Sequence, residues 1–278
     1  EYEGQVALTN LAKSLDPARI KGRVIIMTMA NYPAALAGRR VSPIDDLNMN
    51  RIFPGDPDGT VTRQIAYYID SELIPLADFV MDLHSGGSSL NYVPCALATQ
   101  SNDPVLFQKQ LATLRAFGAP YTYIQGGAQG QGGNQTLGSG AERRGKIALG
   151  SELGGSGTVN RAGLAIAERG VRNVLVHLGI LPASDWVEPP APTRFLDVRG
   201  QDYYVYASEN GVFEPLVELG DTVSIGTPAA RIHFTETPWL PPVEITFKAA
   251  GIVMCKRIPA RTKRGDCLFH LASDLTIT

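Results

Sequence analysis

The chain has 278 residues, 44% of them hydrophobic and 19% charged, and its formal net charge is −2 at pH 7. That length supports one full-sized core and a second, smaller unit, so we expect two domains. The near-neutral balance excludes a broad basic surface of the kind that holds nucleic acid or an anionic membrane. We therefore expect a small-molecule partner, no nucleic acid and no membrane, and the composition is compatible with a homo-oligomer.

Hydropathy and cysteine spacing exclude two further classes of protein. The longest apolar stretches, Val24–Met29 and Val174–Leu181, are far shorter than the roughly 20 residues of a membrane-spanning helix. Cys95, Cys255 and Cys267 lie far apart and form no CxxC pair, which argues against a disulfide framework and a cysteine zinc site. A reducing compartment fits this pattern, so we expect a cytoplasmic protein. The first residue is not Met, which leaves a preceding targeting segment open.

Apolar strand-like runs alternate with helical patterns from residue 1 to about 182, which predicts a mixed α/β sheet with helices on both faces. Asp103 and Gly118 are typical start and stop signals of one helix, and Thr60 and Pro75 have the same roles in another. The Gly- and Gln-rich stretch 125–140 is expected to be either an exposed loop or a lid over the substrate. Helices are expected over residues 8–15, 61–73, 104–117 and after 160, and buried strands over 23–30, 78–84 and 146–153.

The pattern changes after a proline-rich segment at residues 183–194, which we interpret as a linker. It separates a predicted catalytic domain over residues 1–182 from a predicted β domain over residues 195–278. The second part carries short strand-like runs separated by turn signals such as Asn210-Gly211, which predicts a small all-β unit.

Position alone makes His84 a candidate metal ligand. It ends a predicted buried strand and is followed by Ser85-Gly86-Gly87, so its imidazole lies where strands of an α/β sheet open into a crevice. The alternative is a hydrogen-bonded structural histidine. Asp82 faces the same side of the strand by alternation, so it either orients the imidazole or serves as a buried hydrogen-bonding carboxylate.

Four motifs in order resemble the succinylglutamate desuccinylase/aspartoacylase family, and the similarity runs over essentially the whole chain. The motifs are Glu1-Tyr2-Glu3-Gly4, Asn48-Met49-Asn50-Arg51-Ile52-Phe53-Pro54-Gly55, Asp82-Leu83-His84-Ser85 and Ser151-Glu152-Leu153-Gly154. The resemblance implies a zinc carboxypeptidase-like fold and hydrolysis of an amide bond.

The resemblance also implies a zinc ion, Zn2+, as cofactor. Glu1 matches a ligand carboxylate and His84 a ligand imidazole, and the family's third ligand, a His, would lie three residues before Glu1. Two neutral imidazoles and one carboxylate leave an open position on zinc for water, whose pKa the metal lowers to about 7. Two ligands alone would hold zinc poorly.

The same resemblance assigns catalytic and substrate-binding residues. Glu152 matches the carboxylate that accepts a proton from water and returns it to the leaving amine, whereas position alone favours a solvated strand end or a helix-capping partner. Arg51 and Asn50 match the pair that binds a substrate carboxylate and lines the reaction centre, and guanidinium suits this role because it grips carboxylates through two parallel bonds. Either Arg39 or Arg40 is expected to polarise the scissile carbonyl, with surface solvation as the alternative.

Other charged and imidazole side chains receive structural interpretations. Arg143 and Arg144 either add positive potential for an anionic substrate or form a charged rim, and the rim is favoured. His177, His233 and His270 are interpreted as structural.

The C-terminal unit resembles a hammerhead barrel of the lipoyl and biotinyl type through Leu219–Val223, Glu244-Ile245 and Gly251–Val253. Such carriers present a modifiable Lys just before the Glu-Ile strand, whereas this chain has Thr235–Trp239 there. A covalent cofactor is therefore not expected. We expect this unit to pack over the cleft and limit substrate size.

Three functions follow as alternatives. The leading one is a zinc-dependent deacylase of an N-acyl small amino acid, because residues 48–56 and 84–87 most resemble family members that deacetylate N-acetyl-diaminobutyrate in ectoine breakdown. The second is desuccinylase, aspartoacylase-type or carboxypeptidase activity. The third is a non-catalytic binding or carrier protein.

Overall fold

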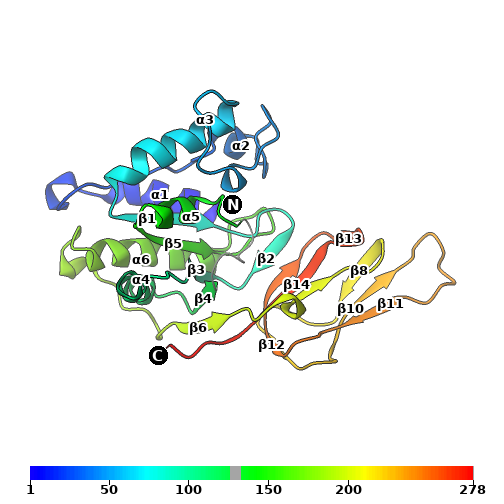
Figure 1. Cartoon of the computed structure of the whole chain (residues 1–278). Helices are drawn as coiled ribbons and strands as arrows, with labels where there is room; N and C mark the ends of the chain where they lie inside the picture. Colours follow the sequence, from blue (N-terminus) through cyan, green and yellow to red (C-terminus); the bar gives the residue numbers. More distant parts are fainter. Residues whose placement is uncertain (126–132, 278) are drawn as a thin grey trace.

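A computed structural model describes residues 1–125 and 133–277 and shows a long mixed sheet that runs through the molecule (Figure 1). Its main path has the strand order β1-β5-β3-β4-β6-β14-β12-β2, with β7 paired to β14 and β9 paired to β12. The strands of this sheet are β1 Phe79–His84, β2 Leu90–Tyr92, β3 Cys95–Thr99, β4 Tyr121–Gln125, β5 Ile147–Glu152, β6 Arg194–Asp197, β7 Tyr204–Tyr206, β9 Thr222–Val223, β12 Gly251–Arg257 and β14 Cys267–Asp274.

Helices cover both faces of the N-terminal part of the sheet, as the sequence predicts. Helices α1, α4 and α6 pack together on one face, around Leu111, Leu149 and Val174. Helices α3 and α5 lie over the other face, around Ala66, Ala141 and Ala148. The helices are α1 Glu3–Ser14, α2 Tyr32–Leu36, α3 Val61–Tyr68, α4 Pro104–Phe117, α5 Leu137–Arg143 and α6 Arg161–His177.

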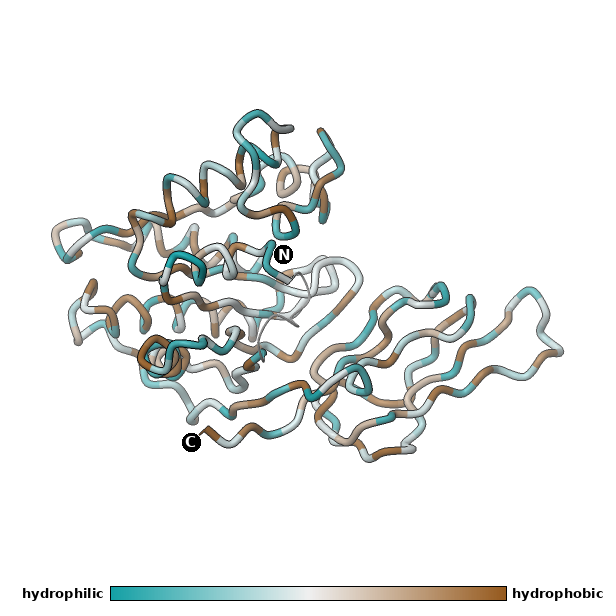
Figure 2. The backbone as a smooth tube through the Cα atoms, in the orientation of Figure 1, coloured by the Kyte–Doolittle hydropathy of each residue, from teal (hydrophilic) through white to brown (hydrophobic). Residues whose placement is uncertain are grey.

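The predicted start and stop signals of the helix at residues 104–117 are confirmed. Asp103 caps α4 by accepting hydrogen bonds from the backbone N–H groups of Val105 and Leu106, at 2.8 and 3.3 Å. Gly118 ends that helix in the left-handed conformation, with φ 66°. Helix α3 follows Thr60 and continues as an irregular turn through Leu73. In Figure 2, short hydrophilic and hydrophobic stretches alternate along α3, as expected of a helix buried on one side.

One predicted strand is wrong. Residues 23–30 form no strand, because no other segment of the described chain pairs with them. Ile25 and Met27 are accordingly 46% and 37% exposed. The Gly- and Gln-rich stretch is also shorter than predicted, since α5 already begins at Leu137 and is capped by Thr136. Residues 126–132 of that stretch, and with them the choice between loop and lid, lie outside the described residues.

The predicted C-terminal strands are present, and some of them form a second sheet with the order β11-β10-β8-β13. Strand β14 continues the main sheet, because it pairs with β6 through Ser273 and Asp274 and with β12 and β7 along the rest of its length. The C-terminal strands are thus hydrogen-bonded to the N-terminal part, and a separate domain at residues 195–278 stays a prediction. The second sheet contains β8 Gly211–Pro215, β10 Pro228–His233, β11 Val243–Thr246 and β13 Arg261–Thr262.

None of the helices in the described part of the chain has the length and apolar character needed to cross a membrane.

Candidate active site

Two neighbouring parallel strands place His84 and Glu152 side by side. Strands β1 and β5 pair in parallel with His84 opposite Glu152, so both side chains leave the sheet on the same face and at the same edge. The backbone N–H of Leu153 donates to the carbonyl of His84 at 3.0 Å and extends the pairing past the strand end. His84, a candidate ligand, and Glu152, a candidate proton acceptor, are 68 positions apart in sequence. Their side chains nevertheless point into the same region at the edge of the sheet.

The imidazole of His84 lies between two carboxylates. Its Nδ1 is 2.8 Å from Glu1 Oε2, and its Nε2 is 2.8 Å from Asp82 Oδ2. The predicted contact between Asp82 and the imidazole is thus present. With Nε2–H donating to Asp82, the lone pair of Nδ1 is directed toward Glu1, which is the state that a metal shared with Glu1 requires.

Asn50 completes this arrangement from a separate turn at Met49–Arg51. Its Oδ1 accepts a hydrogen bond from the backbone N–H of Leu137 at 2.8 Å, which directs its amide nitrogen toward His84 and Asp82. That nitrogen lies 2.8 Å from His84 Nε2 and 3.4 Å from Asp82 Oδ2, and as a donor it bonds to the carboxylate. Asn50 therefore supports the carboxylate that orients the imidazole.

Electrostatics differ sharply among the three titratable groups. Burial works to raise the pKa of Glu1, but attraction to His84 outweighs it and lowers the pKa. Burial disfavours charge on His84, yet Asp82 and Glu1 together raise its pKa well above the usual value. Burial raises the pKa of Glu152 to about 8, and its Oε2 has no hydrogen-bond partner among the described residues. Glu152 is thus a buried carboxyl with one oxygen available to form a hydrogen bond with a ligand.

The structure distinguishes the two candidate arginines. Arg39 pairs with Asp46 at 3.4 Å, and both side chains are at least half exposed. Arg40 instead faces the site, where its positive charge acts to lower the pKa of both Glu1 and Glu152. Burial, together with the charge of Arg40, lowers the pKa of Arg51, whose Nη1 donates to the carbonyl of Asn50 at 2.6 Å.

These groups line one cavity of about 920 Å³, to which the C-terminal strands contribute a wall. Among the described residues, no group of three or more His, Cys, Asp or Glu side chains has metal-binding geometry. Glu1 and His84, the two candidate ligands named from the sequence, lie 2.8 Å apart. Predicted site residues that line the cavity are Glu1, Arg40, Asn50, Arg51, Asp82, His84 and Glu152.

Several other predicted side chains have structural contacts. Arg143 and Arg144, expected to form a charged rim, make ion pairs with the buried carboxylate of Asp70. His233 bonds to Glu214 at 2.6 Å on the second sheet. His177 is the last residue of α6.

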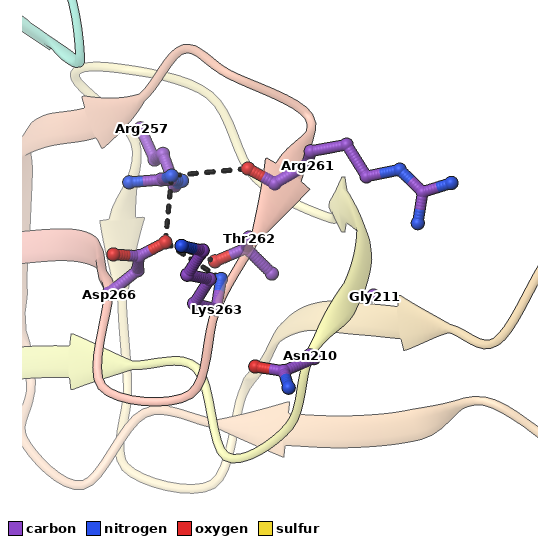
Figure 3. Close-up of a pocket in the computed structure, with 7 residues that line it drawn as sticks. All are labelled: Asn210, Gly211, Arg257, Arg261, Thr262, Lys263 and Asp266. Atoms are coloured by element: carbon purple, nitrogen blue, oxygen red, sulfur yellow. Dashed lines mark hydrogen bonds and ion pairs between the residues drawn. The ribbon is translucent and has the colours of Figure 1, made fainter.

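A second pocket lies in the C-terminal strands, away from the predicted site residues (Figure 3). An ion pair of 2.8 Å between Arg257 and Asp266 spans it, and Asp266 also accepts a bond from the backbone N–H of Lys263. These contacts fix the turn before β14. The pocket is lined by Asn210, Gly211, Arg257, Arg261, Thr262, Lys263 and Asp266.

Sequence reasoning missed two features of the site. Glu3 is fully buried and accepts hydrogen bonds from Ser85 Oγ and from the backbone N–H of Asn160, so it ties α1 to the loop after His84 and to the start of α6. His270 lies in the wall of the catalytic cavity. No local signal marks it, because its position depends on the pairing of strands far apart in sequence.

Comparison with known proteins identifies the same family as the sequence motifs. Residues 1–178 match the model of the succinylglutamate desuccinylase/aspartoacylase catalytic domain. Over 272 residues the chain is 40% identical to N-alpha-acetyl-L-2,4-diaminobutyric acid deacetylase of Halomonas elongata. The aligned region covers 98% of this chain and 78% of the deacetylase.

Solved structures give the same answer. A succinylglutamate desuccinylase/aspartoacylase from Rhodobacter sphaeroides superposes with a TM-score of 0.93 at 39% identity, covering 100% of this chain and 83% of its own. The product-bound ectoine utilization protein EutE (DoeB) from Ruegeria pomeroyi superposes with a TM-score of 0.91 at 39% identity, covering 98% and 82%. The chain belongs to the succinylglutamate desuccinylase/aspartoacylase family.

Proposed function

We propose that this protein is a zinc-dependent deacylase that hydrolyses the amide of an N-acyl small amino acid, with N-acetyl-diaminobutyrate as its substrate. The observation that carries the proposal is the pairing of His84 with Glu152 at one strand edge, with the carboxylate of Glu1 at 2.8 Å from the imidazole. The substrate is suggested by the deacetylase from Halomonas elongata, at 40% identity.

The donor atoms present fit zinc. An imidazole nitrogen and a carboxylate oxygen are ordinary zinc ligands, and ligand atoms on one tetrahedral zinc lie roughly 3.3 Å apart. Glu1 Oε2 and His84 Nδ1 are 2.8 Å apart. The two atoms would have to move apart by only a few tenths of an ångström to bind the same ion. The third ligand would be a histidine upstream of Glu1. When bound, zinc supplies a Lewis acid that polarises the acyl carbonyl and makes water acidic.

The other groups have distinct roles in this proposal. Glu152 accepts a proton from the attacking water and delivers it to the leaving amine, and the burial that raises its pKa makes its carboxylate a stronger base. Arg51 binds the substrate carboxylate. Arg40 donates to the carbonyl oxygen as negative charge develops there. Asp82 and Asn50 hold the imidazole of His84 in place.

The test uses the full-length, zinc-loaded protein and Glu152→Gln, which keeps the size of the side chain and removes proton transfer. We expect release of acetate from N-acetyl-diaminobutyrate by the unaltered protein, and a fall in kcat of about 100-fold or more in the variant with zinc retained. Glu168→Gln is the matched control, because Glu168 lies on α6 and bonds to Asn10 at the surface.

Competing activities give different results. Release of succinate or of C-terminal amino acids in preference to acetate would support a desuccinylase or a carboxypeptidase. Zinc binding without hydrolysis of any substrate would support a binding protein. Hydrolysis at an unchanged rate by Glu152→Gln would refute the assigned base.

The C-terminal strands form one wall of the cavity and so bear on the size of the substrate. Met254, Tyr204 and His270 come from β12, β7 and β14, and they line the cavity that contains Glu152. We propose that these strands act as an all-β unit that closes one side of the cleft and admits only small acyl amino acids.

A further inference from the structure

A row of side chains crosses four strands and faces the catalytic cavity. Tyr92 on β2 lies opposite Cys255 on β12, Cys255 lies opposite His270 on β14, and His270 lies opposite Tyr204 on β7. Residues directly opposite each other in paired strands leave the sheet on the same face. Tyr92, Tyr204 and His270 line the same cavity as Glu152, as does Tyr123 from β4.

His270 is the centre of this row, and its ring nitrogens have no hydrogen-bond partner among the residues that the structure describes. The residue is 5% exposed. Its ring stacks on Tyr204 with centroids 4.7 Å apart and planes inclined by 6°, and it forms T-shaped pairs with Tyr123 and Tyr92 at centroid distances of 5.5 and 6.3 Å. Buried polar side chains are usually hydrogen-bonded, so an unpaired imidazole in a cavity wall points to a ligand.

This wall carries no formal charge, which separates it from the rest of the cavity. All five Lys and Arg side chains among the described lining residues lie within the first 51 residues: Lys21, Arg23, Arg39, Arg40 and Arg51. Burial lowers the pKa of His270 to about 4, so its imidazole is neutral at physiological pH and keeps one acceptor nitrogen. The aromatic row therefore offers ring faces and a lone pair, and no positive charge.

Such a surface discriminates between side chains by charge. Aromatic faces attract ammonium groups, and a neutral imidazole nitrogen accepts a hydrogen bond from one. A carboxylate would lose its water there and meet no cation, which is strongly unfavourable. The cavity thus has a guanidinium side suited to a carboxylate and an aromatic side suited to an amine.

We propose that the row Tyr92, His270 and Tyr204, together with Tyr123, is the subsite for the side-chain ammonium of the substrate amino acid. The subsite selects N-acyl amino acids with a short aminoalkyl side chain and rejects those with an acidic side chain. This inference rests on the proposed deacylase function and adds a residue-level basis for its substrate class.

Three substrates and two variants test the subsite in the full-length, zinc-loaded enzyme. N-acetyl-2,4-diaminobutyrate carries the ammonium, N-acetylnorvaline replaces it with a methyl group of similar size, and N-acetylaspartate carries a carboxylate. The variants are Tyr204→Leu, which removes the stacked ring, and His270→Phe, which keeps a ring and removes the acceptor nitrogen. Tyr68→Leu is the matched control, because Tyr68 lies at the end of α3, is 56% exposed and does not line the cavity.

We expect each variant to lower kcat/KM for the diaminobutyrate substrate by about 10- to 30-fold and to change that for the norvaline substrate by less than about threefold. The control should keep the selectivity of the unaltered enzyme. Thermal melting and zinc content show whether each variant is folded. Binding of free 2,4-diaminobutyrate and free norvaline to the unaltered enzyme, measured by calorimetry, gives the same discrimination without any variant.

Two results would overturn the subsite. Equal losses for the ammonium and methyl substrates would show a structural role or a pocket for the acyl group. Equal binding of diaminobutyrate and norvaline to the unaltered enzyme would show that the ammonium is not recognised. Failure of the deacylase function itself is distinguishable, because the unaltered enzyme would then hydrolyse none of the three substrates.

Discussion

Replacing Gly163 by alanine tests how closely helix α6 packs against the end of strand β5. A Cβ atom at this position would lie 1.7 Å from the carbonyl oxygen of Leu153, where ordinary contacts begin at 3.4 Å. The helix and the strand end must therefore separate by about 1.7 Å at this point. Both atoms belong to stiff segments, because Leu153 is fully buried and its N–H is bonded to the carbonyl of His84.

The expected cost follows from this geometry. Overpacking a core costs about 1–3 kcal/mol, and a clash with backbone lies at the upper end of that range. Alanine recovers about 0.5–1 kcal/mol through its higher helix propensity, which leaves a net loss of about 2 kcal/mol. At about 2–4 °C per kcal/mol for a chain of this size, Tm should fall by about 4–8 °C.

Activity should fall as well, since Leu153 directly follows Glu152. A displacement of about 1 Å at a reacting group can lower the rate by about 100-fold. Thermal unfolding and acetate release from the zinc-loaded variant measure the two effects. Gly138→Ala on α5 is the control, because its Cβ would meet nothing closer than 4.0 Å and its Tm should not fall. A Gly163→Ala protein with the Tm and rate of the unaltered enzyme would refute the close contact.

Two further predictions concern His84 and His270. Asp82→Ala removes the acceptor that orients His84, so zinc affinity measured by chelator competition should fall by about 10- to 100-fold, and unchanged affinity would refute that role. His270 is neutral in the folded state with a pKa of about 4, whereas the unfolded imidazole takes up a proton near pH 6.5. Its contribution to stability is therefore complete above pH 6.5 and is lost as the pH falls toward 4, by up to about 3 kcal/mol. Denaturant unfolding at pH 7 and pH 4.5 measures this loss, which should be smaller in His270→Phe; an identical pH dependence would contradict the buried neutral state.

Local patterns were sufficient to predict most elements and the main candidate residues. The helix of residues 104–117 follows from Asp103 and Gly118, because capping and left-handed turns depend on neighbouring residues only. Strand alternation likewise predicted that Asp82 and His84 share a face, and the 2.8 Å contact confirms it. Residues 23–30 show the limit of such patterns, since an apolar run becomes a strand only beside a partner.

The arrangement of the site depends on contacts between distant segments. Arg39 and Arg40 are equivalent as sequence neighbours, and only the packed structure pairs Arg39 with Asp46 and places Arg40 where its charge lowers the pKa of Glu1 and Glu152. His270 reaches the catalytic wall because β14 pairs with β12 and β7 in one register. Helical and strand periods are set within a few residues, so the sequence alone determined them. Strand order and register minimise the free energy of the whole packed chain, so only the tertiary structure decided which side chains meet.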